Sequence, residues 1–261
     1  MIGVFDSGLG GLTVVKELFR QLPGRGVVYL GDNARFPYGS KGRDVVRQFA
    51  VQDAEFLKAH GADAIIVACN TASALAIDAV RAAVDVPVFE VVTPAVAKAA
   101  VLTRGRVGVI GTRGTIGSGV YAEKMSDASP KTKVFSQACP LFVPLVEEGW
   151  TRRSEASSIA KTYLRPLRLR RIDTLILGCT HYPFLRSQIA AAVGPGVRLV
   201  DPARETVAEF VRFLDSEGEL ALKLAKEITH RFFASDKTEH FSRLAARWLG
   251  QDIILEHASL E

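Results

Sequence analysis

A repeated phrase of eight residues limits the fold of this chain more than any other feature. Residues 62–69 read Ala-Asp-Ala-Ile-Ile-Val-Ala-Cys, and residues 172–179 read Ile-Asp-Thr-Leu-Ile-Leu-Gly-Cys. The apolar run in each copy is typical of a parallel strand that is buried on both faces. Because α/β proteins place their chemistry at the carboxyl ends of such strands, we expect Cys69 and Cys179 to flank one site between two similar halves.

The two halves share more than this phrase. Before each Cys strand, the patterns predict a strand, a glycine-containing turn, a helix, a second strand and a second helix, and this order repeats after roughly 110 residues. The second helix is expected over 44–59 in one half and over 154–164 in the other, where Pro166 should end it. The other strands are predicted at 2–5, 27–30, 106–110 and 133–138. Strands that alternate with helices at this spacing predict parallel sheets with helices on both faces.

The predicted fold class is therefore α/β, with two pseudo-symmetric doubly wound parallel-sheet domains that face each other across a cleft. Past each Cys, a helix should lead to a strand that ends at Thr93-Pro94 in the first half and at Asp201-Pro202 in the second.

The last segment, from about residue 205 to 261, has no counterpart in the repeat. Its patterns indicate helix up to Ile228, strands at 231–234 and 253–256, and a helix at 239–249 between these strands. We expect this tail to return to the first half and enlarge it. The predicted domains are residues 1–94 plus 206–261, and residues 95–205.

Composition restricts the class of protein further. No apolar run reaches the roughly 18 residues that suggest a membrane span, so we expect no contact with a membrane. The N-terminus enters a strand at once, without a basic leader or apolar signal core, which favours a cytoplasmic location. The net charge of +5 is only modestly basic, and the cluster Arg165, Arg168, Arg170 and Arg171 has no interleaved aromatic residue. We interpret it as a solvated helix end, and binding to nucleic acid is disfavoured.

The three cysteines lie far apart, at 69, 139 and 179, so a disulfide framework and a metal site are poorly supported. Cys69 precedes Asn70 and Thr71, and Cys179 precedes Thr180 and His181. We expect the N–H groups of a following helix to lower each thiol pKa from about 8.5 and so to favour the thiolate. A buried, inert Cys is the alternative, but the matched placement favours function. Cys139 is interpreted as a core residue.

Three further residues are candidates with open alternatives. Asp6 ends the first strand and should lie at the same sheet edge as Cys69, although it could instead cap a helix. His181 is two residues from Cys179 and could orient or protonate it. Glu147 ends a predicted helix, and a surface position is the alternative. The turn at Gly8, Gly10 and Gly11 lacks the Lys-Ser/Thr ending of a P-loop, so it indicates a nucleotide site only weakly.

Six phrases, in order, carry a resemblance to a known family: Val4-Phe-Asp-Ser-Gly-Leu-Gly-Gly-Leu-Thr13, Tyr29-Leu-Gly-Asp-Asn-Ala-Arg-Phe-Pro-Tyr-Gly39, Ala68-Cys-Asn-Thr-Ala-Ser73, Gly111-Thr-Arg-Gly-Thr-Ile116, Cys139-Pro-Leu-Phe-Val-Pro-Leu-Val-Glu147 and Gly178-Cys-Thr-His-Tyr-Pro183. The chain resembles the bacterial glutamate racemases of the aspartate/glutamate racemase superfamily over essentially its whole length. The last phrase resembles the glutamate branch, because aspartate racemases carry a Glu where His181 stands.

The resemblance implies a cofactor-independent, homodimeric isomerase that interconverts L- and D-glutamate and feeds peptidoglycan synthesis in the cell wall. It implies acid/base roles for Cys69 and Cys179, assisted by Asp6, Glu147 and His181. It also implies a substrate pocket that Asp6 and His181 share with Ser7, Tyr38, Gly39, Asn70, Thr71 and Thr180, with Thr112 and Thr115 nearby. In one departure, Ala95 stands where a hinge glycine is expected.

Three alternatives remain open from the sequence. The enzyme could act on aspartate or a related acid, the glycine turns could form a nucleotide-binding regulatory module, or the arginine cluster could bind nucleic acid. Pyridoxal phosphate chemistry is not indicated, since no Lys follows either Cys strand.

Overall fold

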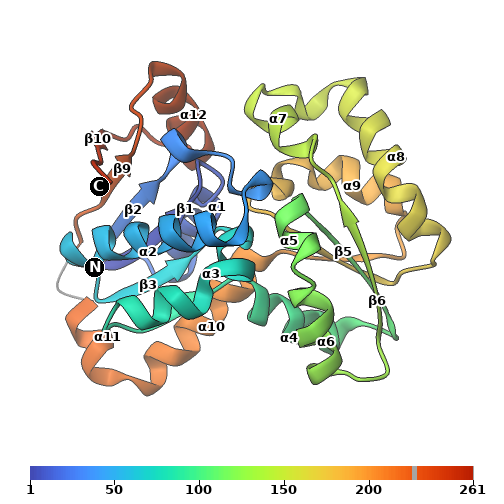
Figure 1. Cartoon of the computed structure of the whole chain (residues 1–261), viewed down its shortest axis with the longest axis horizontal. Helices are drawn as coiled ribbons and strands as arrows, with labels where there is room; N and C mark the ends of the chain where they lie inside the picture. The colour runs from blue at the N-terminus through green and yellow to red at the C-terminus, as the bar shows by residue number, and fades with distance from the viewer. Residues whose placement is uncertain (225–227, 261) are drawn as a thin grey trace.

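The computed structural model describes residues 1–224 and 228–260, and it contains two separate parallel β-sheets (Figure 1). The first sheet has the strand order β10-β9-β2-β1-β3-β4 and the second has the order β6-β5-β7-β8. The strands of the first sheet are β1 (Ile2–Asp6), β2 (Val27–Gly31), β3 (Ala64–Val67), β4 (Val88–Glu90), β9 (Arg231–Ala234) and β10 (Leu255–His257). Those of the second are β5 (Arg106–Gly111), β6 (Lys133–Ala138), β7 (Thr174–Gly178) and β8 (Arg198–Val200).

The two sheets have the same internal order. In each half the first four strands lie side by side in the order second, first, third, fourth, and every pairing is parallel. The predicted α/β class with two pseudo-symmetric halves is therefore confirmed. In such an order the connections leave in opposite directions from the first and third strands, and ligands bind at this switch point, outside the carboxyl ends. The switch points here are β1/β3, which precede Ser7 and Cys69, and β5/β7, which precede Thr112 and Cys179.

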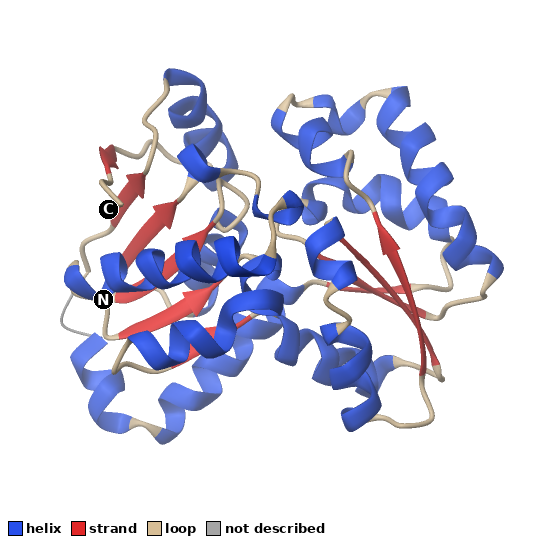
Figure 2. Cartoon of the chain, viewed as in Figure 1, coloured by secondary structure: helices blue, strands red, loops and turns tan. Residues whose placement is uncertain are grey.

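Helices cover both faces of each sheet, as Figure 2 shows. Their bounds are α1 (Leu12–Gln21), α2 (Arg43–Ala59), α3 (Asn70–Ala83), α4 (Val92–Leu102), α5 (Arg113–Gly117), α6 (Val120–Ala128), α7 (Phe142–Glu147), α8 (Ser154–Leu169), α9 (Arg186–Val193), α10 (Pro202–Ser216), α11 (Gly218–Leu224) and α12 (Glu239–Leu249). Short 3₁₀ helices lie at Asn33–Arg35, Tyr38–Ser40, Trp150–Arg152 and Tyr182–Leu185. Among the described residues, no helix combines the length and apolar character that crossing a bilayer requires.

The alternation of side chains along the strands builds three apolar layers. In β1, Ile2 and Val4 pack on the side of α1 and α10, whereas Phe5 packs on the side of α2 and α3. In the second sheet, Val107 and Val109 pack against α4 and α6, and β7 turns Leu175 and Leu177 toward α8 and α9. The layer that contains Ile2 continues across both sheets, so the two halves share one apolar core. Burial of this kind contributes roughly 25 cal/mol per Å² of apolar surface.

The C-terminal tail pairs with the first sheet. Strand β9 hydrogen-bonds to β2, and β10 hydrogen-bonds to β9. The exact domain boundaries remain predictions, because the positions 94/95 and 205/206 fall inside α4 and α10, which pack against each other. The predicted helix up to Ile228 is wrong at its end: α10 and α11 extend to Leu224, residues 225–227 lie outside the described part of the chain, and Ile228 lies in no helix.

Two further sequence-based boundaries are wrong. Helix α8 continues through Pro166 to Leu169, because Leu164 and Leu167 are buried on the core face on either side of the proline. Strand β4 ends at Glu90 rather than at Thr93-Pro94, since the Glu90 carboxylate accepts hydrogen bonds from the backbone N–H groups of Val92 and Thr93 and so caps α4. A side chain that satisfies these first N–H groups stabilises a helix start. Ala95, at the expected hinge, is thus fully buried within a helix.

Candidate active site

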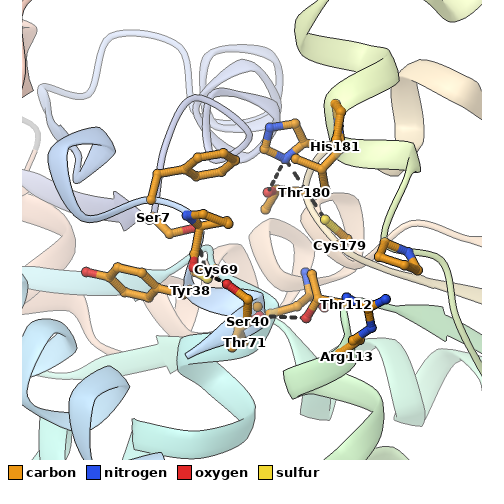
Figure 3. Close-up of a pocket in the computed structure, with 17 residues that line it drawn as sticks. Ser7, Tyr38, Ser40, Cys69, Thr71, Thr112, Arg113, Cys179, Thr180 and His181 are labelled. Atoms are coloured by element: carbon orange, nitrogen blue, oxygen red, sulfur yellow. Dashed lines mark hydrogen bonds between the residues drawn. The ribbon is translucent and has the colours of Figure 1, made fainter. Parts of the chain in front are cut away.

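A cavity of about 220 Å³ lies at the carboxyl ends of the two sheets. Cys69, after β3, and Cys179, after β7, both line it, and Figure 3 shows Cys69 near Ser7 and Cys179 below His181. The cavity is smaller than the roughly 300–1,000 Å³ of drug-sized ligand sites, so it suits a small metabolite. The two cysteines therefore border a single cavity from the two halves of the molecule.

Nine of the residues expected at the site line this cavity: Ser7, Tyr38, Gly39, Cys69, Asn70, Thr71, Cys179, Thr180 and His181. Thr112 also lines it. Asp6, Glu147 and Thr115 do not, but each contacts a side chain that does. The roles assigned to all of these residues remain predictions.

Seven lining residues were not expected from the sequence: Phe36, Pro37, Ser40, Arg113, Pro140, Val143 and Pro144. All of them except Ser40 lie within the phrases at 29–39, 111–116 and 139–147, and Ser40 directly follows the first of these, so the motifs did contain a signal for this set. Five of the seven are apolar, and their residue types alone do not indicate a site. Arg113 is exposed, and it brings a positive charge to the wall of the cavity.

Cys69 is a buried thiol at the N-cap of α3. Its Sγ donates to Ser7 Oγ at 3.6 Å and accepts from the backbone N–H of Ala72 at 3.5 Å. Burial raises the pKa of the Cys69 thiol to about 12, and the negative charge of Asp6 adds to the shift, so the hydrogen bond from Ala72 does not offset it. The expectation that the helix N-terminus lowers this pKa is therefore wrong. Cys69 is held as the neutral thiol.

Cys179 lies beside a histidine–carboxylate pair. His181 Nδ1 is 4.0 Å from Cys179 Sγ, and His181 Nε2 is 3.1 Å from Glu147 Oε1. Burial alone would lower the pKa of His181, but the hydrogen bonds and charges of Cys179 and Glu147 together raise it to about 10. The imidazole is therefore positively charged at neutral pH, and its charge faces the sulfur. The surroundings of the two thiols thus differ in charge although their positions in the fold are equivalent.

Asp6 hydrogen-bonds to residues of both halves at the site. Its Oδ2 accepts from the backbone N–H of Gly8 at 3.1 Å, and its Oδ1 accepts from Thr180 Oγ1 at 3.3 Å. Burial raises the pKa of Asp6, although the charge of His181 and these hydrogen bonds oppose the shift. Asp6 is thus held from both halves, and its negative charge contributes to the raised pKa of Cys69.

The Tyr38 hydroxyl points away from the cavity into a buried polar cluster. It hydrogen-bonds to Asp32 and, at 2.8 Å, to Asp53 Oδ2, while the Arg35 guanidinium donates to the same two carboxylates at 2.6 and 2.9 Å. Ser235 Oγ, just after β9, donates to Asp32 Oδ1 at 2.8 Å. The cluster ties the segment that carries Tyr38 to the C-terminal tail, and it occupies the Tyr38 hydroxyl, which is therefore not a candidate donor to a ligand.

Side chains of both halves occupy the space around the glycine turn. A Cβ at Gly10 would lie 2.1 Å from Thr180 Oγ1, and one at Gly11 would lie 2.6 Å from the Asp6 Cβ. The turn is therefore not an open cradle for a phosphate, which argues against the nucleotide-binding alternative. In the described residues, no group of three or more His, Cys, Asp or Glu side chains is arranged to hold a metal ion.

The charge on His181 predicts a pH dependence of stability. Since its pKa is about 10 when folded and about 6.5 when unfolded, the protonated ring contributes stability that is complete below about pH 6.5 and is lost as the pH rises through about 10. We expect the free energy of unfolding of the wild type to exceed that of His181→Asn most at about pH 6 and least above about pH 10. Urea unfolding of both proteins across this range measures the difference. A difference that grows with pH contradicts the assignment.

Comparison with known proteins gives a consistent family assignment. A family model described as Asp/Glu/Hydantoin racemase matches residues 2–210. A glutamate racemase of Geobacter metallireducens is 47% identical over 253 residues, which cover 95% of this chain and 92% of that protein.

Two solved structures are similar over the whole chain. A glutamate racemase isoform of Bacillus anthracis matches with a TM-score of 0.94 and 40% identity, covering 100% of this chain and 97% of that one. A glutamate racemase of Francisella tularensis, solved in complex with D-glutamate, matches with a TM-score of 0.91 and 39% identity, with the same coverage of both chains.

Proposed function

The chain belongs to the Asp/Glu/hydantoin racemase family, and on this basis we propose that it interconverts L- and D-glutamate without a cofactor, using Cys69 and Cys179 as its two acid/base groups. The enzyme is an amino-acid racemase, in the isomerase class. The observation that carries the two-thiol scheme is that both sulfurs line one small cavity from equivalent positions of the two halves.

In the proposed reaction, one Cys acts as a thiolate and removes the proton from Cα, so the C–H bond breaks and its electron pair moves toward the α-carboxylate. The other Cys, as a thiol, then gives its proton to the opposite face of Cα, and the configuration is inverted. Positioned acid/base groups contribute roughly 10²- to 10⁴-fold each. The surroundings of the two thiols fit such a division of roles, because Cys69 is a neutral thiol, whereas Cys179 faces the charged His181.

The site must also stabilise the negative charge that develops on the α-carboxylate. Asn70, Thr71 and Thr180 follow the two thiols and line the cavity, which makes them candidate donors. The Thr71 hydroxyl lies 2.9 Å from Thr112 Oγ1 and 3.2 Å from Thr115 Oγ1, across the two halves. These hydroxyls hydrogen-bond to one another, and each can instead donate to a carboxylate without becoming an unpaired buried donor.

We further propose that the enzyme works in the cytoplasm as a homodimer and provides D-glutamate for peptidoglycan. The likeness to relatives named glutamate racemase supports this role.

The substrate is tested by incubating the purified chain separately with L-glutamate, D-glutamate and L-aspartate, with no cofactor added. Circular dichroism should show the optical signal of either glutamate enantiomer decaying to zero, with kcat/KM for aspartate lower by about 10²-fold or more. Equal rates with aspartate would redirect the proposal to the aspartate branch, and no decay with any of the three would refute racemisation.

A further inference from the structure

We propose that Tyr121 is a positioning residue that fixes the side-chain amide of Asn70 with its NH₂ group directed into open space at the active site. The inference rests on the proposed function, in which Asn70 is a donor to the substrate carboxylate. Nothing in the sequence motifs singled out Tyr121, because it lies between two of the six phrases.

The inference rests on a hydrogen bond between a tyrosine of the second half and an asparagine of the first. Tyr121, on α6 of the second half, donates from its hydroxyl to Asn70 Oδ1 at 2.7 Å, and Asn70 is the first residue of α3 in the first half. Both side chains are buried, with 3% of each residue exposed. Burial raises the pKa of Tyr121 well above its usual value, so the phenol keeps its proton and remains a donor. A phenol is a stronger donor than acceptor, so this contact favours the amide orientation in which Oδ1 faces the hydroxyl over the one in which Nδ2 does.

The other end of the amide is left for a ligand. Within the described residues, Asn70 Nδ2 makes no hydrogen bond. In the same part of the chain, Thr206 Oγ1 is the only fully buried side-chain N or O atom that lacks a hydrogen-bond partner, so Asn70 Nδ2 is not fully buried. The Asn70 nitrogen is therefore accessible. Asn70 lines both the main cavity and a smaller one, and Cys179 and Thr180 line these two cavities as well. A free amide could flip by 180° and present its oxygen to a carboxylate, which would repel it. The hydrogen bond from Tyr121 disfavours that flip before the substrate arrives, because the flipped amide would exchange a phenol donor bond for a weaker one to the phenol oxygen.

The position of Tyr121 is itself set by the second sheet. A Cβ placed on Gly178 would lie 3.2 Å from the Cε2 atom of the Tyr121 ring, so the ring packs directly on the last residue of β7. Gly178 precedes Cys179, and Asn70 follows Cys69. Tyr121 thus contacts the chain neighbour of each thiol: its ring contacts Gly178, next to Cys179, and its hydroxyl contacts Asn70, next to Cys69. This geometry couples the orientation of the donor to the placement of both sulfurs.

Tyr121→Phe tests the inference because it keeps the ring on Gly178 and removes only the hydroxyl. We expect kcat to fall about tenfold in both directions with KM changing less than about threefold, since a misoriented donor loses the stabilisation of developing charge. The matched control is Tyr163→Phe, which deletes a phenol hydroxyl of the same half that accepts from the backbone N–H of Leu141 and does not line the cavity. This control should retain wild-type kcat.

A double-mutant cycle separates positioning from a merely structural role. If Tyr121 acts through the amide, Tyr121→Phe should cause no further loss of kcat in an Asn70→Ala background. An additional tenfold loss there, or wild-type kcat in Tyr121→Phe, would overturn the inference. The wild-type rate with glutamate tests the proposed function separately, because normal racemisation alongside an unaffected Tyr121→Phe variant refutes only the role of Tyr121.

Discussion

Replacing either Cys69 or Cys179 with serine is expected to lower the rate of racemisation by about 10²- to 10⁴-fold. A serine hydroxyl has nearly the same shape as a thiol, but it does not ionise near neutral pH and cannot serve as the base. Inversion requires a base on one face of Cα and an acid on the other, so the loss of one sulfur stops both directions of the reaction. Circular dichroism with each glutamate enantiomer measures this loss.

The two variants should nevertheless differ in D₂O. The remaining Cys can still remove the Cα proton from the enantiomer that presents that proton to its side, and it can return a deuteron to the same face. Each variant should therefore exchange the Cα proton of one enantiomer only, and the two variants should select opposite enantiomers. Proton NMR of recovered glutamate detects the exchange. Exchange of the same enantiomer by both variants would contradict the placement of the thiols on opposite faces.

Cys139→Ser is the matched control for these variants. Cys139 is also buried, but its Sγ donates to the backbone carbonyl of Gln137 at 3.7 Å, and the residue does not line the cavity. We expect a loss of stability of about 1 kcal/mol or less, without loss of activity. If either active-site variant racemised glutamate as fast as this control, the two-thiol scheme would fail.

The fold was largely predictable because its signals are local. The two apolar runs that end at Cys69 and Cys179 read as buried strands, and the repeat of the pattern predicted two similar sheets. The error at Pro166 arose where packing against the core outweighs a local preference, whereas the error after β4 arose from a local cap, the Glu90 carboxylate. Pro166 should end a helix by its own chemistry, but the burial of Leu164 and Leu167 keeps the chain helical across it.

The site was only partly predictable, because its chemistry depends on groups brought together from both halves. The position of Cys69 before a helix predicted a lowered pKa, but burial and the charge of Asp6 reverse the direction. Similarly, the contact between Glu147 and His181 spans 34 positions, and the contact between Tyr121 and Asn70 spans 51. Neither spacing carries a periodic signal, so only the folded chain reveals these pairs.

Gly10→Ala is expected to reduce kcat/KM by about 10²-fold while leaving the fold intact. A Cβ at this position would lie 2.1 Å from Thr180 Oγ1 and 2.6 Å from His181 Nδ1. Both atoms belong to buried, hydrogen-bonded side chains, so they can move only by giving up the Thr180–Asp6 bond or the contact between His181 and Cys179. A displacement of about 1 Å at reacting groups costs about 10²-fold in rate.

Gly117→Ala distinguishes this steric effect from a general sensitivity to glycine replacement. Gly117 ends α5, and a Cβ there would meet no atom within 4 Å, so this variant should keep wild-type activity. Far-UV circular dichroism should show the same helix content in both variants, because Gly10 lies outside the helices. Wild-type kcat/KM in Gly10→Ala would mean that the first half can move away from Thr180 and His181 at no catalytic cost. The close approach of the two halves would then not be a requirement of the reaction.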